Sequence, residues 1–504
     1  MKNLLTNEQM RKVDAFAMQK VSSLELMEHA GKAVFKRIQE LLKDRSGKVV
    51  CVCGGGNNGG DGFVTARLLL SNRYDVCVLC RAEKFSKEAI VNRGKYLSLG
   101  GEIFSDMPKD RVTIIVDCLL GTGFFGEVRA ETSALIKLIN AKKEAGSYVV
   151  SVDIPSGICG DNGLGELFVF ADETLCVGEE KLGVWLLNGL DGAGEVRTLD
   201  IGLKGFENEN YVRLIEKQDV KKLLPVRRRN SHKGSYGKVA ILGGSEQYFG
   251  AGYLSCLSAL NSGVGYTAWF LPKELIKTAF LKIPEALFVS TNDGYRYEFS
   301  EEICQKLCEY DAIALGMGLG VSEAIYKTIL YLFKHYNGKL LLDADGLNSL
   351  AKFGKADDFL KIKECDVVIT PHMKEFSRLT KIDISDLQSE PLRYINEWMK
   401  KYATTLLLKG ASTLIASGQK IVLTARGCSA QAKGGSGDVL AGLIAGLCAQ
   451  GKNSFEAAVL GSYMVGVSAE ICAKNKSEYS ALPTDFIACI GAAFCSISDT
   501  RKFE

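Results

Sequence analysis

The sequence predicts an α/β protein with two domains, each built on a parallel sheet with helices on both faces. Short apolar segments that can form strands alternate with longer segments of helical periodicity, and this alternation is typical of parallel sheets. The chain has 504 residues, which is more than one hydrophobic core usually organises. Two glycine-rich loops of different design, residues 54–62 and 433–438, each follow a possible strand near opposite ends of the chain. We therefore expect two domains, each with a site of its own.

The composition is that of an ordinary globular protein. Hydrophobic residues make up 47% and charged residues 24% of the chain, which excludes a largely disordered or fibrous protein. The net charge of +3 is too near zero for a dedicated nucleic-acid binder, and we interpret the basic run at 227–229 as an exposed linker. No segment has the ~18 uninterrupted apolar residues of a membrane span, and the first residues lack the apolar run of a signal peptide. We therefore expect a cytoplasmic protein that binds neither nucleic acid nor membrane.

The 16 cysteines are spread over the whole chain, and many lie in apolar runs such as residues 49–53. This distribution differs from the dense cysteine pattern of small disulfide-stabilised domains. Cys77 and Cys80 have the spacing of a redox or zinc pair, but they lie in an expected strand and no second pair stands at a finger-like distance. We expect buried thiols, and a structural role for this pair.

The first domain is expected to open with two amphipathic helices. The second begins at a capping box, in which Ser22 and Glu25 satisfy backbone donors at the start of the helix. Apolar residues then recur at helical spacing from Leu26 to Leu41. Strands are expected afterwards, with helical segments between them, at residues 48–53, 75–80, 112–118, 148–154 and 173–177.

The pattern loosens between Leu199 and Val226, where charged residues and Pro225 separate two apolar regions. We place the domain boundary near residue 217, which gives domains of residues 1–216 and 217–504. The end of the second domain is expected to be mostly helical, and no repeat of fixed period relates the two domains. Its strands are expected near residues 236–244, 312–316, 339–342, 367–370 and 404–408.

The first glycine loop has the G-x-G-x-x-G spacing of a dinucleotide site, through Gly54, Gly56 and Gly59. Glycines let backbone N–H groups approach a phosphate, and the helix that follows adds its positive end. The second strand ends at Arg81, however, where a standard dinucleotide site has a carboxylate for the ribose. The loop instead carries polar side chains that suit a cation or a polar substrate, although asparagine–glycine pairs also form plain turns. These side chains are Asn57, Asn58 and Asp61.

Two more aspartates end strands of the same expected sheet. Asp117 leads into a second glycine-containing loop, and Asp153 comes before a proline–glycine turn. Ligands of open α/β sheets bind beyond the carboxyl ends of the strands. One aspartate at a strand end is often only a loop cap, but Asp61, Asp117 and Asp153 should converge on one crevice.

These residues resemble the amino-terminal domain of bifunctional NAD(P)H-hydrate repair enzymes, the hydrate epimerases. The resemblance covers most of residues 1–215 and is carried by residues 24–31 (LELMEHAG), 57–62, 117–123 and 151–157 (SVDIPSG). It implies a Rossmann-like three-layer α/β/α domain that interconverts the R and S epimers of NADHX and NADPHX. Either loss and return of the ring hydroxyl or ring opening could achieve this.

The resemblance also implies roles for residues. Asn58, Asp117 and Ser156 would help to coordinate K⁺, and Asp153 would be the acid/base that contacts the hydrated nicotinamide. The residues implied to bind NAD(P)HX in this domain are Asn57, Asn58, Gly59, Gly60, Asp61, Gly121, Thr122, Gly123, Phe124, Phe125, Gly126, Glu127 and Asp153.

The second glycine loop combines an anion hole with a base. It precedes an apolar helix, so backbone amides at the helix start can stabilise a transferring phosphoryl group. Asp438, in the first turn, can accept a proton from a substrate hydroxyl. The alternative is that the glycines and the aspartate only cap a buried helix.

This second half resembles the ribokinase-like fold and, more narrowly, the ADP- or ATP-dependent NAD(P)H-hydrate dehydratases. The resemblance extends over nearly all of residues 230–500. Its signatures are residues 232–237 (HKGSYG), 250–252 (GAG), 284–286 (PEA), 343–348 (DADGLN), 370–372 (TPH), 375–376 (EF) and 409–413 (KGAST).

The resemblance implies that Asp438 is the base when ADP or ATP, with Mg²⁺, phosphorylates the ring hydroxyl. Loss of phosphate then regenerates the dihydronicotinamide, and ADP is the donor expected for the fused form. The implied adenine-nucleotide site is Lys409, Gly410, Ala411, Ser412, Thr413 and Gly437, and the implied hydrated-coenzyme site is Ala251, Gly318, His372 and Asp438. By themselves, His372 and Lys409 could instead be a surface histidine and a solvated strand end.

Two other functions stay open from the sequence. The glycine loop with its base is shared across the ribokinase-like fold, so the second domain could phosphorylate a vitamin precursor or a sugar. The first domain could be a non-catalytic nucleotide-binding module that regulates its neighbour. Compact α/β enzymes of this size often self-associate, so we also expect a homo-oligomer.

Overall fold

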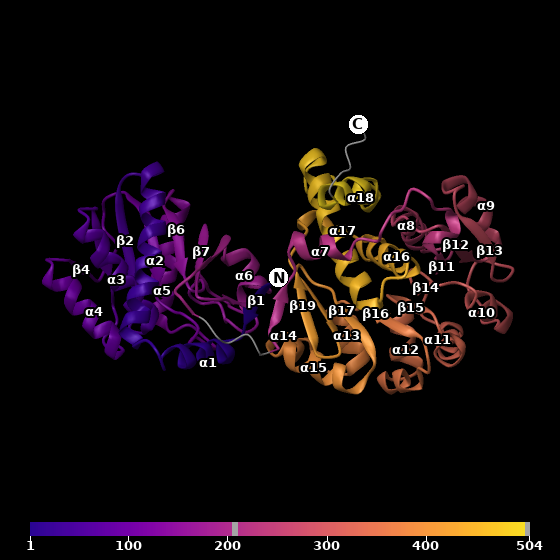
Figure 1. Cartoon of the computed structure of the whole chain (residues 1–504), viewed down its shortest axis with the longest axis horizontal. Coiled ribbons are helices and arrows are strands. Elements are labelled where there is room, and N and C mark those ends of the chain that lie inside the picture. Colours follow the sequence, from indigo (N-terminus) through magenta and orange to yellow (C-terminus); the bar gives the residue numbers. More distant parts are fainter. Residues whose placement is uncertain (204–209, 499–504) are drawn as a thin grey trace. The chain divides into compact units, whose positions relative to one another are not determined.

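A computed structural model describes residues 1–203 and 210–498. The chain forms two compact units, one of residues Lys2–Val212 and one of residues Arg213–Glu504, to which Met1 also belongs. The first unit runs from indigo to purple and the second from magenta to yellow in Figure 1. Each unit has its own sheet and its own core.

The first unit contains a seven-stranded sheet with the order β4-β3-β2-β5-β6-β7-β9. All neighbouring strands are parallel. The strands are β2 (Lys48–Cys53), β3 (Val76–Leu79), β4 (Ile103–Phe104), β5 (Val112–Cys118), β6 (Tyr148–Val152), β7 (Glu173–Val177) and β9 (Glu195–Leu199). In addition, β1 (Lys2–Leu5) pairs parallel with β8 (Glu180–Lys181).

Helices cover both faces of this sheet, so the expected three-layer arrangement is confirmed. Val49 of β2 packs with α2, α3 and α4, whereas its neighbour Val50 packs with α5 on the opposite face. This alternation explains why the strands read as continuous apolar runs. The helices are α1 (Asn7–Ala17), α2 (Ser23–Asp44), α3 (Asn57–Ser71), α4 (Lys87–Ser98), α5 (Ala130–Glu144), the short α6 (Asn188–Gly192) and the 3₁₀ turn η1 (Leu182–Trp185).

The second unit contains a larger sheet, in which β13-β12-β11-β14-β15-β16-β17 are parallel neighbours. An antiparallel extension, β17-β18-β19, follows, and β10 pairs parallel with β19. The strands are β10 (Val212–Leu214), β11 (Lys238–Leu242), β12 (Tyr266–Leu271), β13 (Leu287–Ser290), β14 (Ala312–Leu315), β15 (Lys339–Leu342), β16 (Asp366–Ile369), β17 (Thr404–Leu408), β18 (Thr413–Ser417) and β19 (Lys420–Thr424).

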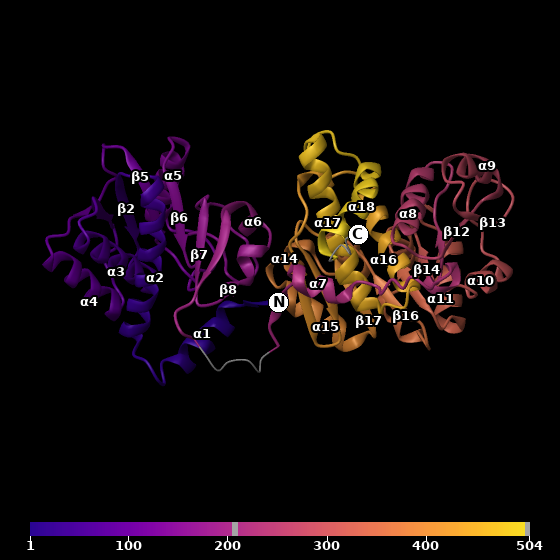
Figure 2. The ribbon, with the colours of Figure 1, turned by 45° about the horizontal axis from the view of Figure 1, so that its top comes forward.

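Helices also lie on both sides of this second sheet. Figure 2 shows α16, α17 and α18 on one side and α11 and α15 on the other. The helical segments of this unit are α7 (Lys217–Leu223), η2 (Lys233–Tyr236), α8 (Phe249–Asn261), α9 (Lys273–Lys282), α10 (Glu301–Leu307), α11 (Glu323–His335), α12 (Asp345–Phe353), η3 (Ala356–Lys361), α13 (Met373–Thr380), α14 (Ile384–Ser389), α15 (Pro391–Lys401), η4 (Ser429–Gln431), α16 (Ser436–Ala449), α17 (Ser454–Lys476) and α18 (Pro483–Ile497).

Two expectations about buried residues can be checked here. All 16 cysteines are free, and most are buried. By length and composition alone, α17 could cross a membrane, but 78% of its most apolar stretch is buried inside the protein. It packs against α16 and α18, so we describe it as a core helix of this unit.

The sequence analysis did not predict several strands, namely β1, β4, β8, β9, β10, β12, β13, β18 and β19. The pair β18–β19 is a hairpin whose turn contains Gly418 at a φ of 58°. Each of its strands has only five residues, so the pattern of apolar residues is too short to distinguish the strands from the flanking loops. Elements that were predicted agree closely, including the capping box at Ser22 and Glu25, where each side chain bonds the other residue's backbone N–H.

Candidate active sites

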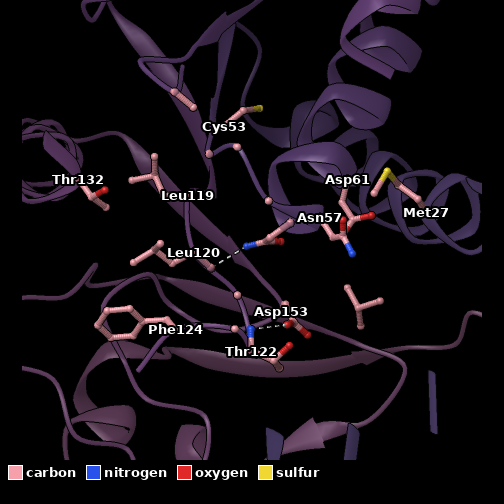
Figure 3. Close-up of a pocket in the computed structure, with 18 of the residues that line it drawn as sticks. Met27, Cys53, Asn57, Asp61, Leu119, Leu120, Thr122, Phe124, Thr132 and Asp153 are labelled. Carbon is pink, nitrogen blue, oxygen red and sulfur yellow. Dashed lines mark hydrogen bonds between the residues drawn. The ribbon is translucent and has the colours of Figure 1, made fainter. Parts of the chain in front are cut away.

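The first unit has a cavity of about 1110 Å³ at the carboxyl ends of its central strands. The loops after β2, β5 and β6 line it, together with parts of α1 and α2. Figure 3 shows Asp61 and Asp153 on different sides of this space, with Leu119, Leu120 and Phe124 along another side. The strand-end loops that the sequence pointed to therefore meet around one cavity.

The glycine loop after β2 is held by close backbone packing. A Cβ atom on Gly54 would lie 2.0 Å from the carbonyl oxygen of Leu119, and one on Gly59 would lie 1.9 Å from that of Gly54. Gly56, at the N-cap of α3, gives no side-chain cap. The positive end of α3 therefore remains available to an anionic ligand group.

Asn58, Asp117 and Ser156 form a buried polar cluster beneath the cavity. The amide nitrogen of Asn58 donates to the carbonyl oxygens of Leu120 (2.7 Å) and Val152 (3.1 Å). Its Oδ1 atom is buried and has no hydrogen-bond partner among the described residues. A buried acceptor without a donor is costly unless another group, such as a cation, satisfies it.

The carboxylate of Asp117 is fully buried and accepts several hydrogen bonds. Ser151 Oγ (2.8 Å), Ser156 Oγ (2.6 Å) and the backbone nitrogens of Ser156 (3.0 Å) and Leu119 (3.2 Å) donate to it. Burial raises the pKa of Asp117, and the hydrogen bonds from Ser156 and Ser151 oppose this rise. The cluster fixes the loops after β5 and β6 relative to each other.

Asp153 occupies a strained backbone position with a φ of 73°, which few non-glycine residues adopt. Its carboxylate forms an ion pair with Lys181 Nζ, and the backbone nitrogen of Thr122 lies 3.4 Å from its Oδ2. The side chain of Asp153 is 14% exposed, whereas that of Lys181 is 1% exposed. Asp153 thus presents its carboxylate to the cavity from a rigid site.

Lys181 is a residue that the sequence analysis missed. Its Nζ also donates to the carbonyl oxygens of Val177 (2.9 Å) and Glu179 (3.0 Å). Burial by itself lowers the pKa of this lysine, but attraction to Asp153, together with Cys176 and Asp14, outweighs burial and raises it. A lysine just after the strand β7 was the available signal.

Asp14 of α1 also lines the cavity and was not predicted as a site residue. It lies one turn after the buried Met10 on the same face of the helix. Burial raises the pKa of Asp14 to about 6; Lys181 opposes this rise and Asp153 adds to it. Burial also raises the pKa of Asp61 well above its usual range, with a further contribution from Asp153.

Most residues expected to bind the coenzyme in this unit line the cavity. Gly59 and Gly60 instead pack inside the protein, Gly59 against Gly54 and Gly60 against Met27, and Gly126 is not in the lining. The expected residues that do line the cavity are Asn57, Asn58, Asp61, Gly121, Thr122, Gly123, Phe124, Phe125, Glu127 and Asp153.

The second unit has another lysine among carboxylates, and this lysine is partly buried. Lys409, after β17, places its Nζ 2.7 Å from Asp343 Oδ1 and 3.9 Å from Glu375 Oε2. Burial lowers the pKa of Lys409, but Asp343 and Glu375 outweigh that effect and raise it. Asp343 is 2% exposed, and Ala344 beside it has a φ of 48°, so strain occurs at this site too.

Asp438 lies in the first turn of α16, after Gly435 with a φ of 102° at the N-cap. Burial is the main reason that the pKa of Asp438 rises to about 7, and repulsion from Asp343, Asp345 and Glu375 adds to it, while Lys409 opposes it. A group with this pKa can accept a proton near neutral pH.

The other expected residues of the second unit form two groups. Gly437 adjoins Lys409, since its Cβ position would be 3.4 Å from Lys409 Nζ. His372 bridges to Lys409 in the sheet, and its Nδ1 accepts from the backbone nitrogen of Glu375 (3.2 Å). Ala251 and Gly318 touch each other, because a Cβ on Gly318 would lie 2.8 Å from that of Ala251.

Solvent exposure changes along the segment Lys409–Thr413. Gly410 and Ala411 are exposed, while Ser412 and Thr413 are buried where β18 begins. Within the described ranges 1–203 and 210–498, no three or more His, Cys, Asp or Glu side chains gather as a metal cluster. Any Mg²⁺ here would depend on phosphate oxygens and water as well as protein carboxylates.

Comparison with known families divides the chain in the same way. The profile described as "YjeF-related protein N-terminus" matches residues 23–183, and that of NAD(P)H-hydrate dehydratase matches residues 239–491. The bifunctional NAD(P)H-hydrate repair enzyme of Thermofilum pendens is 32% identical over 83% of this chain and 82% of its own. The enzyme of the same name from Escherichia coli K12 is 31% identical over 83% of this chain and 79% of its own.

Solved structures resemble the second unit. A ribokinase-like superfamily protein from Enterococcus faecalis V583 is 24% identical with a TM-score of 0.50, and covers 58% of this chain and 99% of its own. It shows the ribokinase-like fold. The ADP/ATP-dependent NAD(P)H-hydrate dehydratase of Bacillus subtilis, crystallised with ATP/Mg²⁺, is 29% identical over 57% of this chain and 99% of its own, with a TM-score of 0.49.

Proposed function

The chain belongs to the family of bifunctional NAD(P)H-hydrate repair enzymes, which join an epimerase to a dehydratase, and we propose that Asp153 and Asp438 carry the proton transfers of its two reactions. We assign epimerisation to residues 1–216 and dehydration to residues 217–504. The observation that supports these roles best is the placement of each aspartate near a lysine in a separate unit: Asp153 pairs with Lys181, and Asp438 follows Gly437, whose Cβ position would lie 3.4 Å from Lys409 Nζ.

In the first unit, the epimerase would interconvert the R and S forms of NADHX and NADPHX. The cavity is large enough for the hydrated nicotinamide and its ribose, and the open N-terminus of α3 suits a phosphate of the coenzyme. Asp153 would contact the hydrated ring. Its strained backbone and its ion pair with Lys181 hold the carboxylate in one orientation.

We also propose that Asn58, Asp117 and Ser156 help to hold K⁺ in this unit. The donor set fits, because K⁺ takes oxygen ligands and Asn58 Oδ1 is a buried acceptor without a donor among the described residues. When bound, the ion would neutralise charge near Asp117. Exchanging K⁺ for Li⁺ should slow epimerisation and leave dehydration unchanged, and equal rates in both salts would remove this assignment.

In the second unit, Asp438 would take the proton from the ring hydroxyl of the S epimer while that oxygen attacks the terminal phosphorus of ADP or ATP. Phosphorylation converts hydroxide into a better leaving group, and loss of phosphate restores the dihydronicotinamide. The pKa of Asp438, raised to about 7 by burial and nearby carboxylates, suits a base near neutral pH. Mg²⁺ would enter with the nucleotide and neutralise phosphate charge.

The nucleotide would lie along Lys409–Thr413 and Gly437, with ADP as the preferred donor, and the hydrated coenzyme would contact Ala251, Gly318 and His372. The placement of Gly437 beside Lys409 supports the proposed nucleotide site, and the contact of Gly318 with Ala251 supports the proposed site of the hydrated coenzyme.

We also propose that the protein is cytoplasmic and forms a homo-oligomer. Light scattering of the purified chain would test the oligomeric state.

The assay that tests the proposal starts from mixed NADHX epimers with Mg²⁺ and either ADP or ATP. Absorbance of the dihydronicotinamide should return completely, because epimerisation feeds the S form to the dehydratase. Recovery that stops once the S epimer is consumed would contradict the epimerase assignment. A stable phosphorylated vitamin precursor or sugar, with NADHX unchanged, would instead identify a small-molecule kinase.

A further inference from the structure

Three carboxylates and one lysine meet in the cavity of the first unit. Asp14 comes from α1, Asp61 from α3, Asp153 from the loop after β6, and Lys181 from β8, and all four line the cavity. Their charges act on one another: Lys181 and Asp153 influence Asp14, and these three influence Asp61. Only Asp153 has a direct ion pair with the lysine among the described residues.

Epimerisation by loss and return of the ring hydroxyl needs a second proton-transfer group besides Asp153. The ring hydroxyl must leave from one face of the ring and water must return to the other face. Departure requires a proton on the leaving oxygen, whereas return requires removal of a proton from water. One carboxylate cannot reach both faces of a bound ring, so the two jobs call for two groups on different sides of the cavity.

We propose that Asp14 is this second group: it protonates the departing hydroxyl while Asp153 takes the proton from the water that adds to the opposite face. The inference rests on the proposed epimerase function of this unit. In the first step the C–O bond at the hydrated carbon breaks, its electron pair leaves with oxygen as water, and the ring nitrogen stabilises the cation. In the second step water forms the new C–O bond.

Protons are conserved over one catalytic cycle of epimerisation. Each conversion in one direction moves one proton from Asp14 to Asp153, and exchange with solvent returns it. In the opposite direction the two aspartates exchange roles. The ion pair with Lys181 holds the carboxylate of Asp153 in one orientation toward the cavity, so Asp153 is assigned as the initial proton acceptor. No oxidant, reductant or further reactant is needed.

Asp14 suits this role better than Asp61. Burial raises the pKa of Asp14 to about 6, with Lys181 opposing this and Asp153 adding to it, so it can give up and regain a proton near neutral pH. The pKa of Asp61 is raised well above the usual range by burial and by both other carboxylates. The direction of this shift makes Asp61 less suited than Asp14 to proton exchange near neutral pH.

The test compares Asp14→Asn with Glu8→Gln in the full-length chain. Glu8 lies on the same helix but is exposed and pairs only with Lys12 among the described residues. Chiral chromatography of NADHX epimers gives kcat and KM for epimerisation from pH 5 to 9, and dehydration of pure S epimer confirms an intact second unit. Thermal unfolding of both variants checks the first unit.

We expect Asp14→Asn to lower kcat for epimerisation roughly 10²–10⁴-fold, the usual contribution of one acid/base group, with KM little changed. The decline in wild-type rate above about pH 6 should disappear from the residual activity, and Asp14→Glu should recover part of the rate. Glu8→Gln should behave as wild type. If Asp14→Asn unfolds, Asp14→Ser provides the same comparison.

Wild-type kcat in a folded Asp14→Asn chain would overturn this inference alone, as would an effect confined to KM. A wild-type chain that does not epimerise NADHX would overturn the proposed function as well. The two failures are therefore distinguished by the wild-type measurement.

Discussion

Both sites contain a lysine beside aspartates, but the lysine pairs with a different kind of aspartate in each site. In the first unit, Lys181 pairs directly with Asp153, the proposed acid/base, and its other hydrogen bonds go to backbone carbonyls. In the second unit, Lys409 pairs with Asp343 and lies near Glu375, while Asp438 has no recorded ion pair with it among the described residues. The lysine therefore pairs with the proposed acid/base in the first unit, but with a carboxylate near the proposed base in the second.

Asp153 and Asp438 therefore have different electrostatic surroundings. In the first unit, Lys181 contacts the carboxylate of Asp153 directly in an ion pair. Asp438 instead faces Asp343, Asp345 and Glu375, and burial together with these charges raises its pKa to about 7. A carboxylate with a pKa near neutral pH, such as Asp438, can act as a base by itself.

The largest effect is expected for Lys181→Met, which removes the ion pair between Lys181 and Asp153 in the first unit. Loss of the lysine leaves the Asp153 carboxylate without its cation, and removing one member of a buried ion pair usually costs about 3–5 kcal/mol of stability. We expect epimerisation to fall roughly 10²–10⁴-fold and the first unit to unfold at lower denaturant concentration. Dehydration of the S epimer should persist.

The control is Lys137→Met on the exposed part of α5. It removes one positive charge from the same unit without touching the cavity, and surface substitutions usually change stability by less than about 0.5 kcal/mol. Wild-type epimerisation by Lys181→Met would mean that the ion pair is structural only.

A second comparison concerns the two glycine loops. In Gly59→Ala the new Cβ would lie 1.9 Å from the carbonyl oxygen of Gly54, so the loop after β2 must shift. Gly434 has open space where a Cβ would go. We expect Gly59→Ala to destabilise the chain by about 1–3 kcal/mol and to reduce epimerisation strongly.

In Gly434→Ala the folded state should keep its stability, and any loss should be in nucleotide affinity, because the methyl group would take up space beside the anion hole. Urea unfolding and nucleotide titration separate the two effects. Equal destabilisation by both substitutions would show that the loops do not differ as the structure indicates.

The smallest expected effect is a pH dependence of opposite sign in the two reactions. Asp438 must be ionised to act as a base, so dehydration should rise tenfold per pH unit below about pH 7 and level off above it. Epimerisation should decline above about pH 6, where Asp14 loses its proton. Parallel pH profiles would contradict the different protonation states of the two sites.

The free energy of unfolding should also depend on pH through the raised pKa of Asp438. The pKa of Asp438 is about 7 in the folded chain against an ordinary value of 3.8, so the folded state binds more protons between these values and its stability falls as pH rises from about 4 to 7. Asp438→Asn should lose this dependence, which urea unfolding at pH 4 and pH 8 would detect.

The sequence predicted the layered architecture because buried parallel strands read as uninterrupted apolar runs, as in β2 and β5. It also pointed to Asp153 and Asp438, since carboxylates beside glycine turns at strand ends or helix starts have few structural uses. Asp153 does line the cavity and Asp438 does lie in the first turn of α16, while their catalytic roles stay predictions. Lys181 and Asp14 were missed because their roles depend on tertiary contact. A lysine after β7 and an aspartate on a surface-like helix face are common, and only the fold brings them to one cavity.

The most direct test of the account measures both reactions in the two single variants Asp153→Asn and Asp438→Asn. Epimerisation is followed by chiral chromatography, and dehydration by absorbance from pure S epimer with Mg²⁺ and ADP or ATP. We predict that Asp153→Asn loses epimerisation alone and that Asp438→Asn loses dehydration alone. Loss of both reactions in either variant, with folding intact, would contradict two separate carboxylates serving two separate sites.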